Sequence, residues 1–301
     1  MAGLWAFDVS GIAGDPSAPQ TAWVASSNGV WRTTEGGANW ALKSAGLTNR
    51  SINCIVRAAA SRVLYACTGD GAFRSTDGGE KWSRHQSGLS RDTRIIGVAV
   101  DPANPTILYA RDAHWVYRSG DGGITWKKSD AELESSGTIN GLFALGVKPG
   151  TPNAVFASVF RHFWKSTDDG TTFVKSGSGL PLSRVQTVLA DAKGTTVWLG
   201  TEGEGVWRSD DGGTTWNESR AGMGAVNVQA LLVDAALPGT LYAAAWNKGV
   251  YHSSDGGRTW RLVGGPPPHP DVIALTLHPA VPGQVLVGTR SGGGAWRLRP
   301  S

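Results

Sequence analysis

The chain has 301 residues, a formal net charge of +4 at pH 7 and a sequence pI near 9.2. Charged residues make up 17% of it, and Lys and Arg are scattered without the basic stripe that binds phosphates, so we expect no nucleic-acid partner. No apolar run approaches the length that crosses a bilayer, and residues 1–8 have neither the basic start nor the apolar stretch of a signal peptide. We therefore expect a soluble chain without a membrane span, and its compartment stays open.

One eight-residue phrase recurs six times, each time after a short stretch rich in aromatic residues. The copies are Thr33–Trp40, Ser75–Trp82, Ser119–Trp126, Ser166–Phe173, Ser209–Trp216 and Ser253–Trp260. Their third positions are Glu35, Asp77, Asp121, Asp168, Asp211 and Asp255, so successive copies are 42 to 47 residues apart. A seventh copy of the aromatic stretch, Gly294–Arg297, ends the chain without the phrase. A period of this length, with several short strands in each unit, indicates propeller blades or a solenoid.

The third unit shows the plan of one repeat. Ile95–Val100 is predicted to be the innermost strand, Ile107–Ala110 the second and Val116–Arg118 the third, with Trp126 at the start of an outer fourth strand. The 42 glycines and 15 prolines agree with an all-β chain that has many turns. We predict a seven-bladed β-propeller of four-stranded antiparallel blades, a single domain over residues 1–301.

The last blade lacks its outer strand, because the chain stops at Ser301 soon after the third strand. Leu4–Val9 either supplies that strand and closes the ring, or forms the innermost strand of the first blade. Closure by the N-terminus would remove an exposed sheet edge. The sequence leaves both roles open.

The repeated phrase has the residues of a stabilised tight turn. A carboxylate followed by glycines can accept nearby backbone N–H groups while Gly takes positive φ, and the final aromatic can pack over the turn. We expect all six acidic residues to be structural, because equivalent positions in successive blades lie far apart around a ring. The six histidines show no metal-ligand spacing, so we expect no metal or cofactor.

Ser209–Trp216 matches the form Ser-x-Asp-x-Gly-x-Thr-Trp at every position, and the chain therefore resembles the Asp-box, or BNR, repeat family. That resemblance implies a β-propeller but leaves function open, because the family includes sialidases, xyloglucan-active glycoside hydrolases, sortilin-type receptors and photosystem II assembly factors. The Arg-Ile-Pro motif of sialidases and the Gly-Trp-Ala-Val-Gly phrase of the assembly factors are absent from the sequence. The xyloglucan-active enzymes resemble two propellers in tandem, and the sortilin-type receptors add a cysteine-rich module and a membrane span. We expect a recognition propeller, with a glycoside hydrolase as the alternative.

The loops that join second to third strands differ most between repeats, and they lie on the face opposite the boxes. Repeat proteins often place their binding residues in such variable loops. The predicted ligand-binding residues are Arg111, His114, Trp115, Phe160, Arg161, Trp246, Asn247 and Arg290. Their aromatic rings and polar groups would suit either a glycan or a protein or peptide partner, and they would also suit ordinary solvated loops. The oligomeric state is not predicted.

A glycosidase needs two carboxyl groups roughly 5 to 10 Å apart. Among the acidic residues on this face, Glu204 and Asp271 are the predicted acid and base. Cys54 and Cys67 are the only cysteines, and they fall on adjacent strands of the second blade. We favour two buried free thiols there, and a bond between them stays open.

Overall fold

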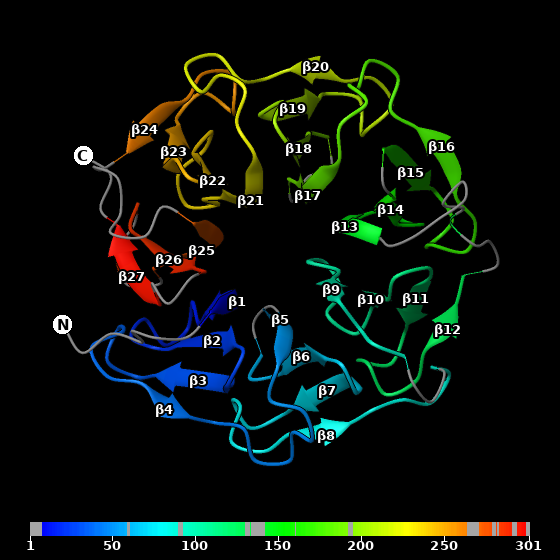
Figure 1. Ribbon diagram of the computed structural model, residues 1–301. Helices are drawn as coiled ribbons and strands as arrows, with labels where there is room; N and C mark the ends of the chain where they lie inside the picture. The colour runs from blue at the N-terminus through cyan, green and yellow to red at the C-terminus, as the bar shows by residue number, and fades with distance from the viewer. Residues whose placement is uncertain are drawn as a thin grey trace.

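The computed structural model describes residues 8–58, 61–89, 93–129, 133, 142–159, 161–191, 195–263, 271–278, 281, 283–290 and 294–298. Over these ranges the chain forms strands, turns and loops, with no helix. Seven antiparallel sheets stand around a central axis (Figure 1). The predicted seven-bladed β-propeller is confirmed. Within the same ranges there is accordingly no helix that could cross a bilayer.

Each blade is built outward from the axis in chain order. The innermost strands are β1 (Val9–Gly14), β5 (Ile52–Arg57), β9 (Gly97–Val100), β13 (Leu142–Lys148), β17 (Val185–Ala190), β21 (Val228–Val233) and β25 (Val272–Leu277). The second strands are β2 (Ala22–Ser26), β6 (Leu64–Thr68), β10 (Leu108–Arg111), β14 (Ala154–Val159), β18 (Val197–Thr201), β22 (Leu241–Ala245) and β26 (Val285–Thr289). The third strands are β3 (Gly29–Thr33), β7 (Gly71–Ser75), β11 (Val116–Ser119), β15 (His162–Ser166), β19 (Val206–Ser209), β23 (Gly249–Ser253) and β27 (Ala295–Leu298). The short outer strands are β4 (Ala41–Leu42), β8 (Ser83–Arg84), β12 (Lys127–Lys128), β16 (Val174–Ser176), β20 (Asn217–Glu218) and β24 (Arg261–Val263).

The seventh blade has three strands in the described part of the chain, β25, β26 and β27, and the other six blades have four. Val9 begins β1, which pairs with β2 as the innermost strand of the first blade. This is one of the two roles considered for Leu4–Val9, and residues 4–7 lie outside the described residues. β1 also packs against β25 and β26, so the first and last blades meet around the axis (Figure 1).

The second strands form the most buried layer of the molecule. All five residues of β2, β6, β18, β22 and β26 are buried, and so are all six of β14. Neighbouring blades cover both faces of these strands, which explains their nearly continuous apolar sequences. The innermost strands are less buried, and every residue of β9 is only partly covered.

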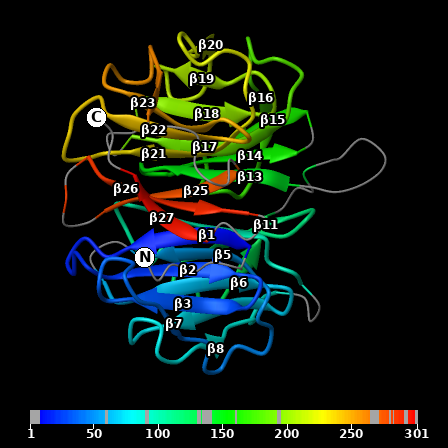
Figure 2. The same ribbon diagram turned by 60° about the vertical axis from the view of Figure 1, so that its left-hand side comes forward.

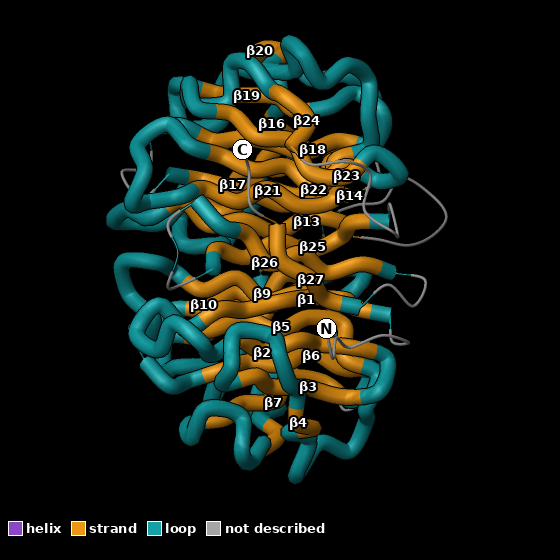
Figure 3. The backbone as a smooth tube through the Cα atoms, turned by 90° about the vertical axis from the view of Figure 1, so that its left-hand side faces the viewer, coloured by secondary structure: helices purple, strands orange, loops and turns teal. Residues whose placement is uncertain are grey.

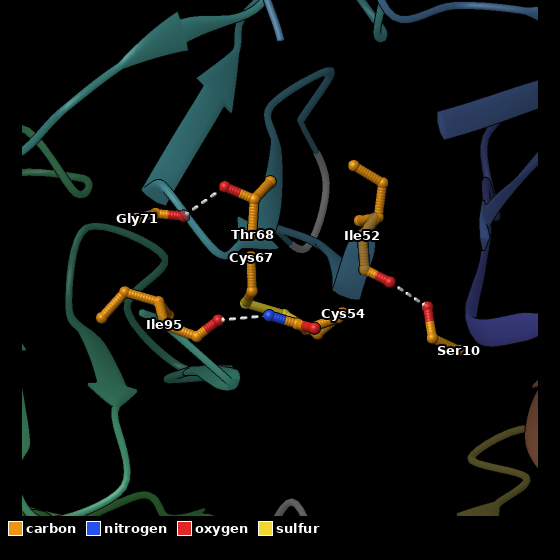
Figure 4. Close-up of a disulfide and its surroundings, with 8 residues drawn as sticks. Ser10, Ile52, Cys54, Cys67, Thr68, Gly71 and Ile95 are labelled. Carbon is orange, nitrogen blue, oxygen red and sulfur yellow. Dashed lines mark hydrogen bonds between the residues drawn. A yellow bond between two sulfur atoms is a disulfide. The ribbon is translucent and has the colours of Figure 1, made fainter. Parts of the chain in front are cut away.

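Six of the innermost strands contain a β-bulge that the sequence did not reveal. In each of them the ladder shifts one residue after the strand begins. A bulge turns the extra side chain away from its usual direction. Ser10 Oγ donates to the carbonyl of Ile52 in the next blade, and Asn53 Nδ2 donates to the carbonyl of Ile95 at 2.9 Å (Figure 4). Two bulges thus link adjacent blades close to the axis.

The same bulge corrects the prediction for the cysteines. Ile52 pairs with Thr68, so an unbroken ladder would place Cys54 opposite Ala66. The bulge shifts the register by one residue and places Cys54 opposite Cys67, with 4.9 Å between their Cα atoms. The two form a disulfide (Figure 4). The expectation of free thiols was wrong because sequence spacing carried no sign of the bulge.

The acidic residues of the boxes bond within their own turns. Ser209 Oγ donates to Asp211 Oδ1 at 2.7 Å and accepts from the backbone N–H of Gly213 at 2.8 Å. The backbone N–H of Thr215 donates to Asp211, and this bond is the largest cause of the lowered pKa of that carboxyl. Burial pulls the pKa of Asp121 and of Asp255 upward, but the bonds from hydroxyl and N–H groups outweigh it and hold both at about 2.

The first box departs from the pattern, and its two changes compensate each other. Glu35 replaces Asp and Asn39 replaces Thr. Asn39 Nδ2 donates to Glu35 Oε2 at 2.6 Å, so the longer acid is bonded by the longer amide. The hydroxyl of Thr33 still accepts the N–H of Gly37 at 2.9 Å, so the turn keeps its shape.

The box turns also join neighbouring blades. Trp23 Nε1 donates to the Gly78 carbonyl at 2.9 Å, Tyr65 Oη to Gly122 at 3.0 Å and Trp198 Nε1 to Gly256 at 3.0 Å. Each donor comes from the second strand of one blade, and each carbonyl belongs to the box of the next. The sequence could have indicated these bonds. Trp23, Tyr65 and Trp198 occupy equivalent positions of second strands, and a buried Trp N–H or Tyr O–H usually needs a hydrogen-bond partner.

Candidate functional site

The loops gather on two opposite faces of the disc, with the strands between them, as the edge-on views show (Figures 2 and 3). Because successive strands are antiparallel, the boxes lie on one face. The other face, called the loop face below, carries the loops between second and third strands and the links between blades. All predicted ligand-binding and catalytic residues belong to the loop face, except that Phe160 lies outside the described residues.

A cavity of about 220 Å³ opens on the loop face between the fourth and fifth blades. Arg161 from the second-to-third loop, His162 from β15 and Lys175 from β16 are among the residues that line it, and the Lys175 ammonium lies over the Trp164 ring, with Nζ 5.4 Å from its centre. The link to the fifth blade adds Leu180, Pro181 and Leu182. None of the described lining residues is acidic. Of the predicted binding residues that the structure describes, only Arg161 lines this cavity.

Two serine hydroxyls also line the cavity. Ser158 is 1% exposed, and neither its Oγ nor the buried Oγ of Ser183 has a hydrogen-bond partner among the described residues. Buried hydroxyls are normally bonded, so both are unusual. Pairing with the third strands places Ser158 at the position of Ala25, Ala244 and Gly200 in other blades, where a small apolar residue packs. Sequence reasoning missed Ser158, and the one difference visible in the sequence is its hydroxyl where Ala25, Gly200 and Ala244 have none.

A second group of predicted residues meets where the sixth and seventh blades adjoin. Asn247 has a positive φ of 57°, a conformation that Asn tolerates. With its amide assigned to satisfy both neighbours, Nδ2 donates to Asp271 Oδ1 at 2.7 Å and Oδ1 accepts from Trp246 Nε1 at 3.0 Å. The Arg290 guanidinium lies 5.8 Å from the centre of the Trp246 ring, within the range of a cation–π contact. The structure thus brings Trp246, Asn247, Arg290 and Asp271 together, and they contact one another.

In the third blade, Asp112 organises the loop that contains two predicted residues. Its Oδ1 accepts the backbone N–H groups of His114 at 2.7 Å and Trp115 at 2.6 Å. The Trp115 ring is half-buried, and Lys128 Nζ lies 3.7 Å from its centre. Arg111 ends β10, and burial lowers the pKa of its guanidinium to about 10 against the opposing effect of Asp112. His114 is exposed, whereas Arg111 and Trp115 are held among neighbouring groups.

Glu204, the predicted acid, forms an ion pair with Arg220. Arg220 Nη1 lies 3.0 Å from Glu204 Oε2, and Arg220 Nη2 lies 3.0 Å from Glu218 Oε1. Glu204 belongs to a loop of the fifth blade, and Asp271 directly precedes the first strand of the seventh. Neither lines the cavity between the fourth and fifth blades. Among the residues that the structure describes, no three His, Cys, Asp or Glu are grouped so as to hold a metal ion.

No protein-family model matches the sequence, and no curated protein is detectably similar to it. Solved structures share the fold. A GH74 enzyme from Niastella koreensis matches with a TM-score of 0.79 at 17% identity, over 98% of this chain and 53% of that one. The GH74 xyloglucanase from Xanthomonas campestris matches with a TM-score of 0.73 at 19% identity, over 98% and 52%. The chain spans about half the length of these two enzymes.

YCF48 from Cyanidioschyzon merolae matches along nearly its whole length, with a TM-score of 0.71 at 15% identity over 98% of this chain and 96% of that one. A structure of YCF48 bound to D1 peptide matches with a TM-score of 0.68 at 14% identity, over 99% and 95%. At these identities the likeness concerns the fold alone. Enzymes and a peptide-binding protein both use it.

Proposed function

We propose that this chain is an Asp-box propeller without catalytic activity that binds a peptide segment of a protein partner on its loop face. The observation that carries the proposal is the cavity between the fourth and fifth blades. Leu180, Pro181 and Leu182 form a continuous apolar edge of this cavity, and Leu182 is 74% exposed. An apolar patch bordered by polar residues is typical of interaction surfaces.

The size of the cavity favours a peptide over a glycan chain. Its volume of about 220 Å³ is below the roughly 300 to 1,000 Å³ of pockets that enclose small molecules. One or two side chains of an extended peptide suit such a volume, while the rest of the peptide would lie across the neighbouring loops. The fold-level likeness to YCF48, which has been solved with D1 peptide bound, agrees with this use of the fold.

The surroundings of the predicted catalytic residues support binding rather than hydrolysis. A glycosidase needs two carboxyl groups that both face the scissile bond of the sugar. The Glu204 carboxyl is instead paired with Arg220, whose Nη1 lies 3.0 Å from Glu204 Oε2. The Asp271 carboxyl accepts a hydrogen bond from Asn247.

An array of random dodecapeptides probed with the full chain tests the proposal. We expect a set of peptides to bind, and the Leu182→Ser variant to lose at least tenfold in affinity for them. The matched control is Leu262→Ser on β24, where the side chain is 47% exposed outside the cavity. Absence of bound peptides, or equal binding by both variants, contradicts the proposal. Release of reducing ends from xyloglucan that disappears in Glu204→Gln with Asp271→Asn would establish the glycoside hydrolase instead.

A further inference from the structure

We propose that the cavity between the fourth and fifth blades is a pocket for a tyrosine side chain of the bound peptide. This inference rests on the proposed function and names the residue that such a peptide would place in the cavity. Three features carry it: the strands that form the cavity turn uncharged side chains toward it, two of its hydroxyls have no partner among the described residues, and much of its remaining wall is apolar.

The register of the fourth blade determines which side chains point into the cavity. Neighbouring residues of a strand point to opposite faces of the sheet. Ser158 on β14 pairs with Phe163 on β15, so their side chains share one face. The Phe163 ring packs edge-on against Trp216 of the fifth blade, with 5.5 Å between the ring centres. That face is therefore turned to the fifth blade, and Ser158 points toward the cavity.

The cationic side chains of these strands belong to the opposite face. Trp164 follows Phe163 on β15 and packs against the buried cluster shared by the third and fourth blades. Lys175 pairs with Trp164, and His162 precedes Phe163, so both side chains are turned to the third blade. Arg161 has a partner of its own. An ion in the cavity would lose its hydration without an opposite charge from these strands, so a neutral group is the better ligand.

Two buried hydroxyls at the cavity point to a hydrogen-bonding ligand. Ser158 Oγ from β14 and Ser183 Oγ from the link to the fifth blade have no partner among the described residues. The Thr201 hydroxyl, which lines the same cavity, instead donates to the Gly205 carbonyl at 2.8 Å. A buried hydroxyl without a partner costs the folded protein its desolvation energy. One ligand hydroxyl can satisfy both serines, because it donates to one and accepts from the other.

The apolar wall selects the body that carries this hydroxyl. Leu180, Pro181 and Leu182 follow one another along the cavity, and the buried residues Phe163 and Val185 also line it. A large apolar group that covers these side chains is removed from water, and this favours binding. Tyrosine joins an aromatic ring to a hydroxyl that donates and accepts, whereas the N–H of tryptophan only donates. The combination therefore fits a tyrosine side chain.

Four synthetic peptides titrated into the full chain and followed in the backbone NMR spectrum test this inference. They are acetyl-Ala-X-Leu-amides in which X is tyrosine, phenylalanine, glutamine or O-phosphotyrosine. We expect the tyrosine peptide to shift the amide signals of Gly177 and Leu182 and to bind about tenfold more tightly than the phenylalanine peptide, which lacks the hydrogen bonds. The glutamine peptide lacks the ring and the phosphotyrosine peptide brings a charge, so both should bind more weakly than the tyrosine peptide.

One variant and its control then tie the preference to the cavity. Ser158→Ala places in β14 the residue that β2 and β22 already have at this position, so it should fold. We expect it to weaken the tyrosine peptide about fivefold and the phenylalanine peptide by less than twofold, because only the first uses the hydroxyl. The matched control is Ser27→Ala in the second-to-third loop of the first blade, where the serine is exposed. It should leave both affinities unchanged.

The outcomes separate this inference from the proposed function. If the tyrosine and phenylalanine peptides bind equally and both depend on Leu182, peptide binding stands and the tyrosine pocket is refuted. Tighter binding of the glutamine or phosphotyrosine peptide, or an unchanged preference for tyrosine in Ser158→Ala, also refutes it. If none of the four binds up to millimolar concentrations while the dodecapeptide array yields ligands, only the pocket is refuted. If the array yields none, the proposed function is refuted with it.

Discussion

Replacing Ser209 by alanine should destabilise the propeller by about 3 kcal/mol. The hydroxyl is fully buried at the start of the fifth box, where it donates to Asp211 and accepts from the N–H of Gly213. A hydrogen bond to a charged group contributes about 1.5 to 3 kcal/mol, and the exposure of Asp211 places this bond at the low end of that range. The N–H of Gly213 would then lie buried without its acceptor, at a further cost of about 1 to 3 kcal/mol.

Calorimetry or thermal unfolding followed by tryptophan fluorescence measures this loss. For a chain of this size, about 3 kcal/mol corresponds to a fall in Tm of about 6 °C. The matched control is Thr214→Ala in the same turn. The Thr214 side chain is exposed, and its hydroxyl makes two long bonds, donating to the Asp211 carbonyl at 3.3 Å and accepting from Lys165 Nζ at 3.4 Å. We expect that control to change stability by less than about 0.5 kcal/mol. Equal effects of the two substitutions, or a loss below 1 kcal/mol for Ser209→Ala, would refute the reasoning that the buried hydroxyl holds the turn.

Two further predictions concern the acidic turns and the disulfide. The pKa of Asp121 and of Asp255 is held at about 2, below the ordinary value of about 3.9, so the stability that they contribute is present above pH 4 and is lost as the pH falls toward 2. The Tm of the wild-type protein should therefore fall between pH 4 and pH 2, and the Tm of Asp121→Asn should fall less steeply over the same range. Parallel curves of Tm against pH for the two proteins would show that the box carboxylates are not the cause. Cys54 and Cys67 enclose a loop with a sequence separation of 13, so Cys54→Ala with Cys67→Ala should lower stability by about 3 kcal/mol through the unfolded chain. Alkylation of the denatured wild-type chain without reductant should leave both thiols unmodified, and uptake of two alkyl groups would show that the bond does not form.

The sequence predicted the third blade closely because the signals there are local. The expected strands Ile107–Ala110 and Val116–Arg118 correspond to β10 (Leu108–Arg111) and β11 (Val116–Ser119), one residue apart at their ends. Trp126, expected at the start of the outer strand, lies immediately before β12 and is buried. Alternating apolar residues and turn chemistry act over a few positions, so they can be read without knowing the partners.

The candidate site was predicted only in part, because its surroundings come from distant segments. The loops were placed on one face, and Trp246, Asn247 and Arg290 do meet there. Nothing in the spacing indicated that Arg220 would neutralise Glu204 or that Asp271 would bond Asn247. The first contact joins a loop of the fifth blade to a residue just after the outer strand of that blade, 16 positions along the chain, and the second joins the sixth blade to the seventh.

By itself the sequence determined the repeat, the number of blades and the turns that close them, since periodicity and turn chemistry reside in neighbouring residues. Tertiary structure decided the pairing of Cys54 with Cys67, because one bulged residue shifted the ladder by a position. It also decided that Ser158 and Ser183 line one cavity with Arg161, since β14, its loop and the link to the fifth blade meet only in the closed ring. Contacts between blades depend on strand register and packing, and these are properties of the assembled ring rather than of any single repeat.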